Sequence, residues 1–176
     1  YWRLAPTDTA WTTKQLYFPD TNILITRFLS PHGVGEVQDF MPVASSGHRP
    51  HRLIRRLLCV RGQVTFRVEV EPRFDYGRQA HRTRLHERGA VFESPTLAVA
   101  LDSPLALERS KEGVKANFAL KAGQSTTFVL EMIGDGDEPR SYSEDETRQE
   151  LDDTVGFWRR WLSRSRYEGR WRETVH

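Results

Sequence analysis

The stretch Val64-Thr65-Phe66-Arg67-Val68-Glu69-Val70 decides the fold, because apolar and polar side chains alternate along it without interruption. A period of two is typical of a β-strand with one buried face and one face toward solvent. The preceding run, residues 53–60, is apolar and β-branched, and Arg61-Gly62-Gln63 separates the two runs. We therefore expect a β-hairpin with a short glycine-containing loop, whose second strand is ended by Pro72.

Further strands are expected on both sides of this hairpin. Residues 114–120 and 128–132 each place alternate apolar side chains on one face, and residues 121–125 between them predict a second hairpin. Shorter strand candidates are residues 22–29, 37–41, 90–93, 97–101 and 105–108. Many short strands separated by turn residues favour a mainly β fold, a sandwich or a barrel.

One helix follows the strands. Ser143-Glu144-Asp145-Glu146 has the pattern of a capping box, with Ser143 as the N-cap. Leu151, Val155, Trp158 and Leu162 then recur at helical spacing, acidic residues fill the first turns and arginines fill the last. This pattern predicts an amphipathic helix from about residue 144 to about residue 163, whose apolar stripe must pack against another surface.

Composition limits the function classes. The chain has 176 residues, enough for one domain, and 26 basic against 24 acidic residues give a net charge of +2. So small a net charge does not favour nucleic acid or an anionic membrane as the partner. No apolar run approaches the roughly 20 residues of a membrane span. With a single cysteine, Cys59, no disulfide can form within the chain, and we expect a reducing, cytoplasmic location. Because the chain begins with Tyr1 instead of Met, we expect a piece of a longer polypeptide.

No complete catalytic or metal-binding set is visible. His48 and His51 lack matching ligands, and Asp135 and Asp137 lack the later ligands of a calcium loop, so we expect no metal and no cofactor. Cys59 lies inside an expected strand and is interpreted as a buried small apolar residue. Nothing singles out a catalytic pair, and ion-pair roles are favoured, for the carboxylates Glu69, Glu71, Asp75, Glu93 and Asp102.

Tryptophans and arginines are interleaved at the end of the chain. Read alone, this pattern resembles a stacking surface for single-stranded nucleic acid. A domain interface is the favoured interpretation, because both residue types are enriched at interfaces and the acidic first half of the helix would repel phosphate. The candidate interface residues are Trp158, Trp161, Leu162, Trp171 and Arg172.

Several motifs occur together in a familiar order. They are Pro19-Asp20-Thr21-Asn22, Asp39-Phe40-Met41-Pro42, Pro72-Arg73-Phe74-Asp75-Tyr76-Gly77, Phe157-Trp158-Arg159-Arg160-Trp161 and Tyr167-Glu168-Gly169-Arg170-Trp171-Arg172-Glu173-Thr174-Val175. The set resembles the trehalase-like N-terminal domain of bacterial and archaeal family 15 glycoside hydrolases, which are related to glucoamylases. The resemblance extends over nearly the whole chain.

This resemblance implies three structural parts, of which only the last belongs to the catalytic domain. It implies an antiparallel β-sandwich of the super-sandwich type at residues 1–142, truncated at its N-terminal end. It implies an amphipathic linker helix at residues 143–166 and the start of an (α/α)6 catalytic barrel at residues 167–176. In the family, two glutamates of the barrel hydrolyse trehalose, maltose or similar α-glucosides with inversion. They have no counterpart in this sequence, and the expected partner of the domain is the barrel that would follow in the same chain.

Two other function classes stay open. A carbohydrate-binding module would stack exposed aromatic rings on sugars, with Phe74, Asp75 and Tyr76 as candidate sugar contacts and Tyr17 and Phe18 as further aromatic candidates. A nucleic-acid-binding domain would use the Arg/Trp tail, but the balanced charge argues against it. Pairing of two copies into a homo-oligomer is also open.

Overall fold

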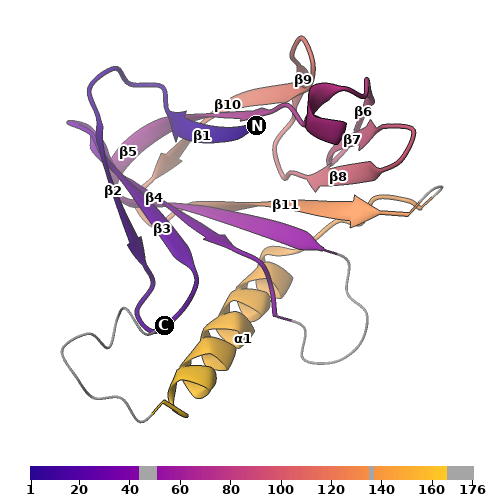
Figure 1. Ribbon diagram of the computed structural model, residues 1–176. Coiled ribbons are helices and arrows are strands. Elements are labelled where there is room, and N and C mark those ends of the chain that lie inside the picture. Colours follow the sequence, from indigo (N-terminus) through magenta and orange to yellow (C-terminus); the bar gives the residue numbers. More distant parts are fainter. Residues whose placement is uncertain (44–50, 135–136, 166–176) are drawn as a thin grey trace.

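The computed structural model describes residues 1–43, 51–134 and 137–165. It confirms a mainly β fold of antiparallel strands with one C-terminal helix (Figure 1). The strands are β1 (Trp2–Pro6), β2 (Thr12–Tyr17), β3 (Leu24–Leu29), β4 (Gly33–Phe40), β5 (Arg52–Val70), β6 (Arg82–His86), β7 (Gly89–Glu93), β8 (Ala98–Asp102), β9 (Glu108–Arg109), β10 (Val114–Lys121) and β11 (Ser125–Ile133). A 3-10 turn, η1 (Asp75–Gly77), precedes β6, and the helix is α1 (Glu144–Leu162).

Strand β5 runs through both layers of the fold. Its first half pairs with β4 and β11 in a sheet ordered β2-β3-β4-β5-β11-β8-β7-β6, which we call sheet B. Its second half pairs with β1 and β10, and β10 also pairs with β9, which makes sheet A. The expected hairpin at residues 53–70 is therefore wrong, because both halves belong to one continuous strand of 19 residues.

Gly62 explains why a turn was expected where the strand continues. It has a positive φ of 70°, as a turn glycine would, but it lies opposite Gly33 of β4. A Cβ on Gly62 would overlap the carbonyl oxygen of His32, so glycine is needed for the close approach of β4. A bulge between Val34 and Gly35 accompanies this approach. The glycine therefore marks the place where β5 passes from one sheet to the other.

The second expected hairpin is right in its strands and wrong in its pairing. β10 pairs with β5 in sheet A, and β11 pairs with β5 and β8 in sheet B. The turn between them thus connects the two layers.

Residues 105–108 are not the strand expected there, since only Glu108 belongs to β9. The chain also contains β1, β2 and β6, which the alternation of residue types does not predict; all six residues of β2 are exposed, so it has no buried face to reveal it.

The two sheets pack face to face, which confirms the sandwich. Phe66 of sheet A lies with its ring centroid 6.3 Å from Phe28 of sheet B and 6.0 Å from Phe118, and Phe118 lies 6.0 Å from Phe128 of sheet B. Cys59 is buried in this core, as expected. Aromatic rings at these separations fill the space between the layers.

Helix α1 covers the outer face of sheet B, away from sheet A (Figure 1). Successive residues of β11 point to opposite faces, so Phe128 enters the sandwich core while Val129 contacts the helix side. Leu151 and Val155 of α1 pack on this second cluster, which contains Ile23, Phe40, Ile54, Val129 and Tyr142. The capping box at Ser143 is present as predicted, with reciprocal hydrogen bonds to Glu146.

Candidate functional site

Buried polar pairs join α1 to sheet B. Arg52 of β5 donates from Nη2 to Oε1 of Glu150 at 2.6 Å, and both side chains are largely buried. The Thr154 hydroxyl accepts from the backbone N–H of Val43 at 3.4 Å. Thr147 and Thr154 are buried on the same side of the helix, a polar component that the apolar stripe did not reveal. The helix is therefore held to the sheet by directional contacts as well as by apolar packing.

Tyr142, just before the helix, lies at the centre of this contact. Its hydroxyl donates to Oε2 of Glu131 in β11 at 2.6 Å. Burial, followed by the hydrogen bond with Glu131, raises the pKa of Tyr142 to about 12. The guanidinium groups of Arg52 and Arg140 lie 5.1 and 4.8 Å from the centre of its ring. These contacts favour a neutral, fixed tyrosine that positions the start of α1.

Asp102, one of the candidate carboxylates, has a structural role at the same place. Its Oδ2 accepts from the backbone N–H of Tyr142 at 3.2 Å, and Arg88 contacts both of its oxygens at 3.4 Å. Arg88 also donates to the carbonyl of Tyr142 at 3.2 Å. Because these interactions occupy the buried carboxylate, Asp102 fixes the chain entering the helix.

The other candidate carboxylates are dispersed over the surface. Glu69 pairs with Arg67, and Glu93 pairs with Arg84. Glu71 lies near Arg73 and accepts from the Ser110 hydroxyl at 3.0 Å. Asp75 is exposed in η1. These positions agree with the ion-pair roles that the sequence favours for most of the group. Within the described ranges, no group of three or more His, Cys, Asp and Glu side chains could hold a metal ion.

The C-terminal half of α1 carries the candidate interface residues. Trp161 is 48% exposed, Trp158 is partly exposed, and their ring centroids lie 5.9 Å apart. Leu162 is only 5% exposed, so its inclusion among the interface candidates is wrong: it packs inside this chain. Trp171 and Arg172 lie outside the described residues.

Two neighbouring segments extend this surface. Phe18 lies under the guanidinium of Arg159 at 5.7 Å, and Val43 contacts the helix through its backbone. Close to these contacts in the chain, Tyr17 is 63% exposed and Met41 is 57% exposed. We call Tyr17, Met41, Trp158 and Trp161 the aromatic face. These four side chains lie on α1 or close in sequence to residues that contact it. Exposed large apolar side chains are typical of a surface that another protein part covers.

The candidate sugar contacts are divided by the fold. Phe74 is buried in the sandwich core and lies 5.3 Å from the ring of His81, so it is not available to a sugar, contrary to expectation. Tyr76 is 94% exposed, with the guanidinium of Arg78 5.8 Å from its ring. Asp75 and Tyr76 have positive φ values of 45° and 55°, a costly conformation for residues other than glycine.

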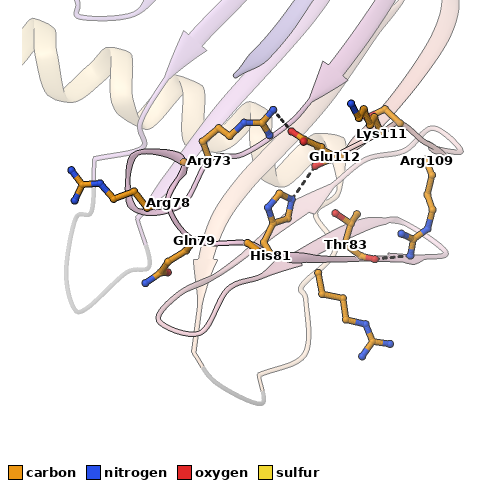
Figure 2. A pocket seen from close by; sticks show the side chains of 13 residues that line it. Arg73, Arg78, Gln79, His81, Thr83, Arg109, Lys111 and Glu112 are labelled. Atoms are coloured by element: carbon orange, nitrogen blue, oxygen red, sulfur yellow. Dashed lines mark hydrogen bonds and ion pairs between the residues drawn. The ribbon is translucent and has the colours of Figure 1, made fainter.

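Beside this turn lies a hollow of about 670 Å³ lined by Arg73, residues 77–83 and residues 109–113. We call it the basic hollow; Figure 2 shows its cationic side chains extending in different directions around it. This hollow is not predictable from the sequence, because its two walls are far apart in the chain. Its only sequence signal was the density of basic residues in each segment.

Among the described residues, no helix is long and apolar enough to cross a membrane.

Comparison with known proteins gives two trehalases that align with almost the whole chain. The trehalase of Thermoplasma volcanium is 21% identical over 178 residues, which cover 99% of this chain and 28% of that protein. The trehalase of Thermoplasma acidophilum is 24% identical over 180 residues, which cover 99% of this chain and 30% of that protein. The chain thus spans less than a third of the length of these curated relatives. No family model matches the chain.

A solved structure shares the fold. A protein assigned as a kojibiose phosphorylase, from the human microbiome, superposes with a TM-score of 0.51 at 9% identity, covering 94% of this chain and 25% of that chain. These findings confirm the resemblance to a trehalase-like N-terminal domain that the sequence motifs indicate.

Proposed function

We propose that this chain, a trehalase-like N-terminal domain, is the non-catalytic part of an inverting α-glycosidase and supports the barrel that carries the chemistry. The observation that carries this proposal is the alignment: 99% of the chain matches only 28–30% of each trehalase. A segment that matches a fraction of an enzyme over its own full length has the proportions of one domain of that enzyme.

The aromatic face is evidence that this domain braces the proposed barrel. Trp161 and Met41 are too exposed to contribute much to the stability of this chain. Trp161 belongs to α1, which is firmly attached to sheet B, and Met41 is two residues from Val43, which contacts α1. Tryptophan and methionine are enriched where protein surfaces meet. A barrel docked here would cover the aromatic face and take its orientation from α1.

The state of the carboxylates supports a non-catalytic role. An inverting glycosidase needs a general acid and a general base about 6.5–9.5 Å apart across the scissile bond. Asp102 is held by Arg88 and by the Tyr142 backbone, and Glu69 and Glu93 are engaged by arginines. We assign catalysis to the barrel, acting on trehalose, maltose or a similar α-glucoside.

Glucose release from trehalose and maltose tests this proposal. We expect no activity from the chain alone and activity from the longer polypeptide in which the barrel follows it. Hydrolysis by the chain alone would refute the non-catalytic role. An inactive longer polypeptide that is correctly folded would refute the α-glycosidase assignment.

A second function is a carbohydrate-binding module, favoured by one observation: Tyr76 presents 94% of its surface to solvent. Tyrosine rings stack on the apolar faces of sugars. Trehalose or maltose would then quench tyrosine and tryptophan fluorescence of the chain, and Tyr76→Ala would abolish the quenching. Unchanged fluorescence at millimolar sugar would remove this alternative.

A further inference from the structure

We propose that the basic hollow is a binding site for a phosphorylated sugar, separate from any α-glucoside site of the barrel. The site is formed by two walls, one containing η1 and the start of β6, the other the turn between β9 and β10 (Figure 2). Its volume of about 670 Å³ lies within the range of small-molecule sites.

The lining of the hollow is strongly basic. The lining contains five cations, Arg73, Arg78, Arg82, Arg109 and Lys111, and one acid, Glu112, which gives five minus one, or +4. The whole chain has a net charge of only +2. Residues outside the hollow must therefore sum to −2, so positive charge is concentrated here.

Most of these cations lack an anionic partner among the described residues. Arg73 pairs with Glu112, and Arg109 donates to the Thr83 carbonyl at 2.6 Å. Within the described part of the chain, no ion pair is formed by Arg78, Arg82 or Lys111. Guanidinium groups match the geometry of phosphate oxygens and hold them through two parallel hydrogen bonds. Free, long cationic side chains around a hollow can close on such an anion.

The two walls of the hollow are fixed to each other by hydrogen bonds. Nε2 of His81 donates to the carbonyl of Glu112 at 2.9 Å, which joins the two walls, and the ring of His81 packs against Phe74 and Phe92. The bond from Arg109 to the Thr83 carbonyl joins the walls at a second point. A frame that is already fixed reduces the ordering cost of binding.

The exposed ring of Tyr76 points to a sugar as the rest of the ligand. It adjoins the hollow through Gly77, and Arg78 contacts both the ring and the hollow. A ligand with an apolar ring face and a phosphate would use both groups at once. The two consecutive positive φ values at Asp75 and Tyr76 are a conformational cost of the kind that is retained at binding sites.

Isothermal titration calorimetry of the chain with glucose 6-phosphate, inorganic phosphate and glucose tests the proposal at low ionic strength. We expect glucose 6-phosphate to bind and glucose not to bind. The variant Arg78→Ala/Arg82→Ala/Lys111→Ala removes three exposed cations that form no ion pair, and should weaken binding about tenfold or more. The control Lys14→Ala/Arg61→Ala/Lys121→Ala removes the same charge from exposed positions elsewhere and should retain the affinity.

Each possible outcome of the titrations supports or overturns the proposed binding site. Equal loss in the control variant would show general charge attraction and overturn the site. Absence of binding by both phosphates at millimolar concentration would overturn it as well. Equal affinity for inorganic phosphate and glucose 6-phosphate would support the oxyanion site and overturn the sugar part of the proposal. None of these results depends on hydrolysis of trehalose, so failure here leaves the proposed function standing.

Discussion

Tyr142 joins three parts of the molecule through one residue. Its hydroxyl contacts Glu131 of sheet B, its backbone contacts Asp102 and Arg88, and the next residue is the N-cap of α1. Glu131 and Asp102 are each about 95% buried, so both carboxylates need the donors that this segment supplies. The attachment of the helix thus depends on a few hydrogen bonds at its start.

Tyr142→Phe should destabilise the chain by about 1–3 kcal/mol, because it leaves the buried Glu131 carboxylate without a donor. The pH dependence has a defined sign. Since the folded-state pKa is about 12, against an ordinary value of 10.0, the unfolded chain loses this proton first, and stability falls as pH rises from 10 to 12. Urea unfolding followed by circular dichroism at pH 8 and pH 11 measures both effects. A Phe variant with the same alkaline loss as the parent would contradict the assignment to Tyr142.

At the scale of elements, β5 depends on Gly62. Gly62→Ala should cost about 2 kcal/mol or more, because alanine adds the penalty of a positive φ and an overlap with the His32 carbonyl. Gly123→Ala is the matched control: its φ is 84°, but a Cβ there meets nothing within 4 Å, so about 1 kcal/mol is expected. Urea unfolding of both variants checks the difference. Equal losses would show that the close approach of β4 is unimportant.

Local signals were readable from the sequence, and long-range pairing was not. The capping box at Ser143 and the extent of α1 depend on neighbours in the chain, and both were predicted almost to the residue. The alternation in residues 64–70 correctly identified a half-buried strand. Alternation says nothing about which strand lies alongside, however. Gly62 could therefore equally signal a turn or a close approach, and only the position of β4 distinguishes the two.

The candidate site residues also divide into those that a local pattern places and those that depend on long-range contacts. Trp161 is 48% exposed, and its place in a domain interface stays a prediction. Leu162 shares the helical period of Leu151 and Val155, which pack on sheet B, and Leu162 is itself buried. The basic hollow brings together residues about 30 positions apart in the chain, such as His81 and Glu112. No periodicity encodes that contact.

At the scale of the whole molecule, neighbouring positions on α1 separate stability from docking. In the chain alone, Leu162→Ala should cost about 2–5 kcal/mol, since it removes a buried side chain, whereas Trp161→Ala should change stability little. If the proposed barrel covers the aromatic face, Trp161→Ala should lower the melting temperature of the longer polypeptide. Thermal unfolding of both variants in both contexts checks this. An unchanged melting temperature for Trp161→Ala in the longer polypeptide would count against docking at this face.

The sharing of β5 between the two sheets also bears on how the chain is made at the ribosome. Of its four partners, β1 and β4 are synthesised before it, whereas β10 begins at Val114 and β11 at Ser125. One edge of a 19-residue strand therefore stays without its partner in the nascent chain until both late strands have emerged. An open edge of this length is the kind of surface that pairs with other chains. Slow translation between β5 and β10 should thus favour aggregation, and chaperones that shield strand edges should act in that interval.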